Sequence, residues 1–128
     1  MSDKATFVFK QGDTYSSGVH IHIFGSNAVE LLREGAPHLR MGNAAYSCAR
    51  FAGFLHTKIS GRLGLGIDPP PKPEDIANDF WDFNPGDKGV FVVDVETGEV
   101  TNFCLYEEPV APFKLTITTA GENPERST

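Results

Sequence analysis

Apolar and polar residues alternate with a period of two in two runs near the start of the chain. Residues 6–10, TFVFK, place Phe7 and Phe9 on one face of a strand. Residues 19–24, VHIHIF, repeat the alternation, with apolar residues at 19, 21 and 23 on one face and histidines on the other. We expect these two strands to pair as a hairpin, joined by a polar loop over residues 13–18.

Spacings of three and four predict two helices in the middle of the chain. The shorter helix begins at Ser26 or Asn27 and ends at Gly35, and Asn27 followed by Glu30 has the form of a capping box. The longer helix covers residues 44–60. Its apolar positions are Ala45, Cys48, Ala52, Leu55 and Ile59. Small residues on one side of this helix predict that it packs closely against a sheet or a second helix.

The second half of the chain predicts further strands and one short helix. Residues 63–67, LGLGI, alternate as a strand whose glycines leave room for a close neighbour, and residues 68–73, DPPPKP, favour polyproline II. A brief acidic helix follows over residues 73–83. Residues 89–95 and 100–106 are rich in β-branched residues, and the Thr-Gly turn between them predicts a second hairpin.

This order of elements predicts one α+β domain over residues 1–120 and a polar tail over residues 121–128. Because a hairpin lies near each end, we expect a mainly antiparallel sheet of about five strands with two helices packed on one face. Residues 113–119 form an edge strand at best, since two prolines precede them closely.

Charge and composition narrow the classes of partner. The chain carries 17 acidic and 11 basic residues, a net charge of −6, which opposes direct binding to nucleic acid. It contains no apolar run near the ~20 residues of a membrane helix, and its first residues lack the apolar core of a signal peptide. We therefore expect no membrane partner and a cytoplasmic location. Cys48 and Cys104 match no metal or redox spacing, and we interpret both as buried thiols.

The sharpest candidate for chemistry is the pair His20 and His22, which point to the same face of a strand. Two imidazoles so placed can bind a transition metal such as zinc, with a third ligand from His56, His38 or an acid in residues 75–82. A small metal-dependent hydrolase is the function that such a site predicts. Two alternatives remain open: acid–base chemistry with a carboxylate partner, or simply the solvated polar face of a half-buried strand.

The second candidate is an acidic-aromatic segment over residues 74–87. Its acids can steer the approach of a basic partner, and its aromatic rings can supply most of the binding energy. The candidate partner-binding residues are Asp75, Asp79, Phe80, Trp81, Asp82 and Phe83. In the alternative interpretation the aromatic rings fill the edge of the core while the acids face water.

Several short motifs resemble those of small phage and bacterial proteins of unknown function, whose layout reads VYLY…HWGG…YLAR…TGFGI…LVVDxxTxTV. The likeness covers most of residues 5–103. It is carried by residues 19–26, Tyr46 with Ala49-Arg50, residues 64–67, residues 92–95, Thr97 and Val100. The chain departs from the layout at Ile23 to Ser26, where the family has His-Trp-Gly-Gly, and at the two histidines that replace tyrosines. The resemblance implies a phage or prophage accessory protein that acts inside a bacterium.

The sequence thus predicts a non-enzymatic cytoplasmic binding protein, monomeric or homodimeric and without a cofactor. We expect it to bind a host protein or a small ligand through the acidic-aromatic segment and the face of His20 and His22. An inhibitor of a nucleic-acid-handling host complex would suit the net charge of −6, because acidic surfaces compete for basic grooves. The alternative is the metal-dependent hydrolase that uses the two strand histidines. A third class stays open, a structural component of a virion or an oligomer, because the edge of a regular hairpin can assemble by strand pairing.

Overall fold

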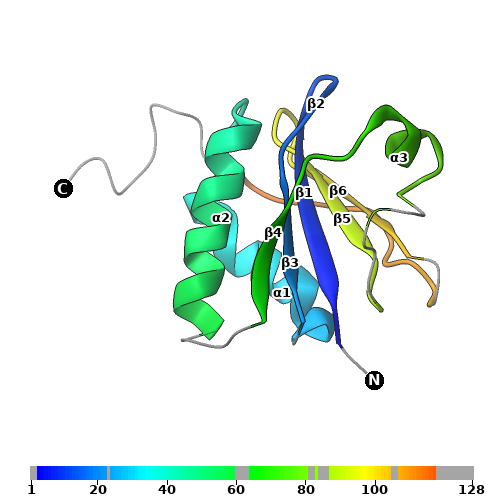
Figure 1. Cartoon of the computed structure of the whole chain (residues 1–128). Helices are drawn as coiled ribbons and strands as arrows, with labels where there is room; N and C mark the ends of the chain where they lie inside the picture. Colours follow the sequence, from blue (N-terminus) through cyan, green and yellow to red (C-terminus); the bar gives the residue numbers. More distant parts are fainter. Residues whose placement is uncertain are drawn as a thin grey trace.

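One mixed sheet runs through the molecule between helices on its two faces (Figure 1). The computed structural model describes residues 3–22, 24–59, 64–80, 83, 87–104 and 107–117. The strands are β1 (Ala5–Gln11), β2 (Thr14–Tyr15), β3 (Gly18–Ile21), β4 (Leu65–Asp68), β5 (Val90–Asp94), β6 (Glu99–Phe103) and β7 (Phe113–Lys114). The helices are η1 (Gly25–Asn27), α1 (Ala28–Gly35), η2 (Ala36–His38), α2 (Ala44–Ile59) and α3 (Pro73–Ala77).

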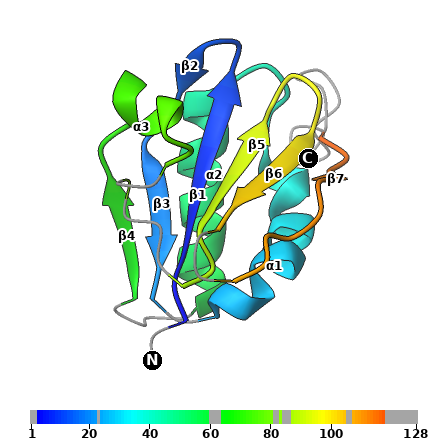
Figure 2. The ribbon, with the colours of Figure 1, turned by 90° about the vertical axis from the view of Figure 1, so that its right-hand side faces the viewer.

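The strand order is β4-β3-β1-β5-β6-β7, with β2 paired to the end of β1 (Figure 2). Both predicted hairpins are confirmed: β1 pairs antiparallel with β3, and β5 pairs antiparallel with β6. The short strand β7 pairs with β6 at one edge, so the predicted edge strand is present over two residues.

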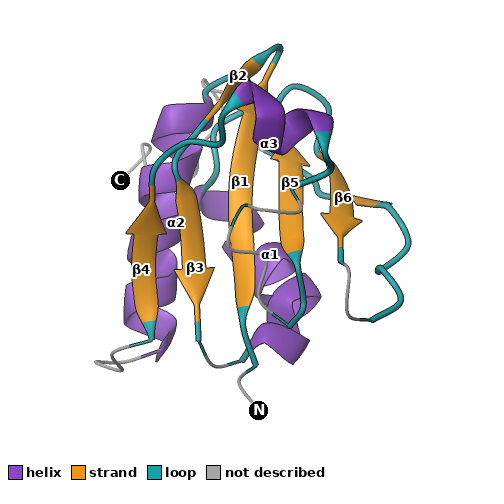
Figure 3. Ribbon diagram, turned by 45° about the vertical axis from the view of Figure 1, so that its right-hand side comes forward, coloured by secondary structure: helices purple, strands orange, loops and turns teal. Residues whose placement is uncertain are grey.

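The structure confirms the α+β class, with α1 and α2 packed on one face of the sheet. The expected details, a mainly antiparallel sheet of about five strands with two helices, differ from the mixed sheet that is found. The described residues contain seven strands and three α-helices, and the central pair β1 and β5 is parallel (Figure 3). The connection from β3 to β5 contains the helices α1 and α2, the strand β4 and the short helix α3. It returns the chain so that β5 runs in the direction of β1, as a parallel pair requires. The strand that the pattern did not show is β2, which has only two residues.

The main core lies between the sheet and the helices α1 and α2. Phe7 and Phe9 of β1 point into it, as predicted, and Phe51 of α2 lies against both rings with centroid distances of 5.0 and 5.6 Å. All three phenylalanines are fully buried, and each contributes about 1.5–3 kcal/mol through burial of apolar surface. These contacts hold α2 across the sheet.

A second, smaller core covers the opposite face of the sheet, beneath α3. Its buried members are Val8, Phe80, Phe83, Val90 and Val92. Because β1 and β5 are buried on both faces, their sequences TFVF and VFVV are nearly continuous apolar runs, as is typical of central parallel strands.

The acidic helix α3 ends at Ala77 rather than at Phe83, which corrects the predicted boundary. Asp79 adopts a left-handed conformation with φ of 57°, its amide donates to the carbonyl of Ile76, and the amide of Phe80 donates to the carbonyl of Asp75. This pair of hydrogen bonds is a Schellman motif, which stops a helix. Asp79 occupies the position after the helix where glycine is usual, so the sequence contained no glycine to mark the end of α3.

The starts of the two longer helices differ from each other. Asn43 caps α2, because its Oδ1 accepts a hydrogen bond from the amide of Tyr46 at 2.9 Å. Asn27 precedes α1 but makes no side-chain cap, and its Nδ2 donates weakly to Glu30 at 3.5 Å. The predicted capping box is therefore absent, although its two residues face each other.

Across the described residues, none of the helices has both the length and the apolar character that a bilayer span needs.

Candidate functional site

His20 of β3 lies beside Asp68 of β4, on the face of the sheet opposite α1 and α2. The Nδ1 atom of His20 is 2.9 Å from Oδ2 of Asp68, and both side chains are about one-fifth exposed, at 19% and 20%. The exposed ring of His22 stands nearly perpendicular to the ring of His20, with centroids 5.0 Å apart. A carboxylate on Nδ1 fixes the orientation of an imidazole, so this pair is a rigid polar feature.

The predicted third metal ligand is not found in the part of the chain that the structure describes. No group of three His, Cys, Asp or Glu side chains there is close enough to hold a metal ion. His56 is exposed on α2, across the sheet from His20, and His38 packs against Phe54 with ring centroids 5.4 Å apart. Sequence reasoning missed Asp68, although its place at the end of a strand that pairs with the histidine strand was an available signal.

Two glycines allow close packing on this same face. Gly66 faces His20 across the β3–β4 pair, so the room that its missing side chain leaves is filled by the imidazole, as the alternating glycines predicted. A Cβ atom on Gly18 would lie 3.1 Å from the ring of Phe83. Since Gly18 and His20 are two residues apart on β3, the two candidate sites of the sequence lie next to each other.

The structure describes four of the six candidate partner-binding residues. Phe80 and Phe83 are 3% and 8% exposed and belong to the second core, which agrees with the alternative interpretation that these rings fill the core edge. Asp75 accepts a hydrogen bond from the amide of Lys72 at 2.8 Å and stabilises the start of α3. Asp79 is exposed. Trp81 and Asp82 lie outside the described residues.

A cavity of about 280 Å³, here named the α3 cavity, opens between α3 and the strands β5 and β6. It contains Asp79 and Phe80 of the acidic-aromatic segment, so one part of that segment does border a hollow. The described residues that line it are Lys10, Tyr15, Ile76, Asp79, Phe80, Val92, Asp94, Glu99, Thr101 and Phe103. Three carboxylates and one lysine thus share the lining with three aromatic rings and two aliphatic side chains.

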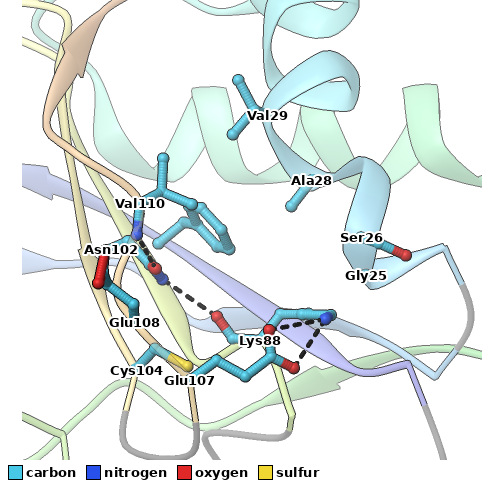
Figure 4. Close-up of a pocket in the computed structure, with 11 residues that line it drawn as sticks. Gly25, Ser26, Ala28, Val29, Lys88, Asn102, Cys104, Glu107, Glu108 and Val110 are labelled. Carbon is cyan, nitrogen blue, oxygen red and sulfur yellow. Dashed lines mark hydrogen bonds and ion pairs between the residues drawn. The ribbon is translucent and has the colours of Figure 1, made fainter.

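A second cavity of about 190 Å³ lies between the start of α1, the start of β5 and the end of β6 (Figure 4). At its mouth Lys88 donates to both carboxylate oxygens of Glu107, at 2.9 and 2.7 Å, and this hydrogen bonding raises the pKa of Lys88. Asn102 lies deeper, where it donates to the carbonyls of Lys88 and Val90 and accepts from the amide of Val110. Asn102 therefore ties the chain after β6 to the sheet.

Both cysteines are free thiols, in different surroundings. Cys48 is a buried residue of α2, and this burial raises the pKa of its thiol, against a smaller lowering by a hydrogen bond with Ser16. Cys104 is half-buried at the second cavity, with its Sγ 3.4 Å from the carbonyl oxygen of Asp87. The interpretation of both as buried thiols is confirmed for Cys48 and holds only in part for Cys104.

Comparison of the chain with protein-family models, curated proteins and solved structures gives no match. The likeness to small phage and bacterial proteins stays a prediction.

Proposed function

We propose that this protein is a non-enzymatic binding protein, and a phage or prophage accessory protein, that binds a host protein or a small ligand at the surface around α3. The observation that carries the proposal is the α3 cavity, because aromatic rings and carboxylates line it together. Aromatic residues dominate the energy of binding surfaces, and charged rims steer the approach of partners. The phage assignment rests on the resemblance of the sequence motifs alone.

The geometry changes which residues are expected to contact the partner, both within the acidic-aromatic segment and around it. Phe80 and Phe83 are buried, so they form the base and the support of the surface rather than its contact points. The half-buried rings of Tyr15 and Phe103, with the exposed carboxylates of Asp79 and Glu99, are the groups that a partner would touch.

The alternative function, a metal-dependent hydrolase, has weaker support. It needs a ligand beyond His20 and His22, and the described residues offer no group of three candidate ligands. The carboxylate that the structure brings to His20, that of Asp68, is hydrogen-bonded to the imidazole at 2.9 Å.

The proposal is tested with three immobilised forms of the protein in a bacterial lysate. The first is the wild type, the second carries Asp79→Asn, Asp94→Asn and Glu99→Gln, and the third is a control. The control loses the same charge at three carboxylates outside the α3 cavity, through Glu30→Gln, Glu34→Gln and Glu108→Gln. We expect a partner that the wild type and the control retain and that the α3-cavity variant loses. Equal retention by all three forms, or by none, contradicts the proposal.

A further inference from the structure

We infer that the α3 cavity takes a cationic group, the guanidinium or ammonium of an arginine or lysine side chain in a basic segment of a partner protein. This inference rests on the proposed function and adds the chemical class of the ligand. It follows from three properties of the cavity: its aromatic lining, the placement of its carboxylates and its size.

The aromatic lining is the first property. Tyr15 and Phe103 are half-buried and both lie close to Phe80, with ring centroids 6.3 and 5.1 Å from that of Phe80. The rings come from β2, from β6 and from the residues after α3. The face of an aromatic ring attracts cations within about 6 Å of its centroid, and grouped rings are the usual receptors of ammonium groups.

The carboxylates are the second property, and they come from three separate elements. Asp79 follows α3, Asp94 ends β5 and Glu99 begins β6. Asp94 is held in place, because its Oδ1 accepts a hydrogen bond from the amide of Glu96 at 2.9 Å. Carboxylates beside an apolar wall act in a lower effective dielectric than bulk water, which strengthens their attraction for a cation.

Lys10 is the one basic residue among the described residues that line the α3 cavity. It is half-buried and lies opposite Asp94 in the β1–β5 register. Its charge offsets part of the negative charge of the lining, so the cavity as a whole remains negative. An incoming cation therefore competes with Lys10 for Asp94.

Size is the third property. The cavity volume of about 280 Å³ is at the lower limit of pockets that hold whole small-molecule ligands, which run from about 300 to 1,000 Å³. One long side chain, whose apolar stem lies on the rings while its charged end meets the carboxylates, fits the chemistry of such a space. The net charge of −6 favours the approach of a basic segment.

The inference is tested by titrating the whole protein with the peptide Gly-Arg-Gly-Arg-Gly and with its citrulline counterpart, which has nearly the same shape and no charge. Backbone NMR shifts locate the binding. We expect the arginine peptide to shift the amides of Tyr15, Thr101 and Phe103, and the citrulline peptide to bind at least tenfold more weakly.

Three variants separate the cavity from general attraction between opposite charges. Asp94→Asn keeps the acceptor for the Glu96 amide and should weaken binding of the arginine peptide at least fivefold, whereas the control Glu108→Gln should change it less than twofold. Lys10→Met should strengthen binding, a gain that misfolding cannot produce.

The outcomes distinguish this inference from the proposed function. Binding of both peptides at the cavity with equal strength would overturn the cationic ligand and leave the proposed surface standing. An arginine peptide that shifts no cavity amide would overturn the inference also, and the lysate experiment would then decide the proposed function by itself. Equal weakening by Asp94→Asn and Glu108→Gln would assign the effect to overall charge and overturn the site.

Discussion

The imidazole of His20 occupies the space into which a side chain on Gly66 would project. A Cβ atom at residue 66 would lie 2.6 Å from Cε1 of His20, far inside van der Waals contact. The ring cannot move aside freely, because Asp68 holds its Nδ1 atom at 2.9 Å. Glycine on β4 and histidine on β3 are therefore a matched pair.

The first prediction follows from this contact. Gly66→Ala should lower the free energy of unfolding by about 1–3 kcal/mol, the usual cost of forcing extra atoms into packed space. In the background of His20→Ala the same change should cost much less, because the obstructing ring is gone. Urea unfolding of the four proteins of this double-mutant cycle measures the difference. Additive costs would show that the two residues do not restrict each other.

Asn102 supports a second prediction, about stability. The residue is 8% exposed, and its side chain bonds to two carbonyls and one amide. Asn102→Ala leaves these backbone groups without that partner and should lower the free energy of unfolding by about 2 kcal/mol. Hydrogen exchange at the Val110 amide should accelerate. The comparison is Asn27→Ala, a change at an exposed residue whose side chain makes one weak hydrogen bond, to Glu30 at 3.5 Å. An equally small effect at both positions would contradict the anchoring role.

A third prediction concerns the two thiols. Only the thiolate reacts with alkylating reagents, and burial both raises the pKa of Cys48 and restricts access to it. Near neutral pH, iodoacetamide should label the half-buried Cys104 first and Cys48 only after unfolding. Mass spectrometry of peptides from the native and the denatured protein measures this order. Equal labelling of both cysteines in the native protein would place Cys48 at the surface.

The fourth prediction concerns the end of α3. Asp79 has a φ of 57°, in the left-handed region where a side chain costs about 1 kcal/mol and glycine costs nothing. Asp79→Gly should therefore raise the free energy of unfolding by about 0.5–1 kcal/mol. Ala77→Gly, at the last residue of α3, should instead lower it, by up to about 1 kcal/mol, because glycine is a poorer helix former than alanine. A change of the same sign in both variants would contradict the Schellman geometry.

Local patterns predicted the elements well, because local physics decides them. The period of two placed Phe7, Phe9, Val19 and Ile21 toward the main core, where all four are fully buried. The parallel pairing of β1 and β5 was missed, because it depends on the route of the chain between distant residues. The continuous apolar runs of these strands were the available sign of central position.

Prediction of the candidate sites was limited in the same way. The pattern placed His20 and His22 on one face, yet it gave no means of choosing Asp68 among 17 acids. The choice depends on β4 pairing with β3, which is a tertiary relationship. For the acidic-aromatic segment, the left-handed turn at Asp79 directs Phe80 to the second core, and helical spacing alone could not show that turn.

The parallel pair at the centre of the sheet sets an order for folding. Its register pairs residue 6 with residue 90 and residue 10 with residue 94, so the paired residues are far apart in the sequence. The hairpin of β1 and β3 needs only a short loop, whereas the central pair must first close a loop of most of the chain. During synthesis the hairpin of β1 and β3 can form first. The edge of β1 that pairs with β5 then stays unpaired until β5 has left the ribosome. Premature pairing of that edge with another chain is the hazard that this topology carries.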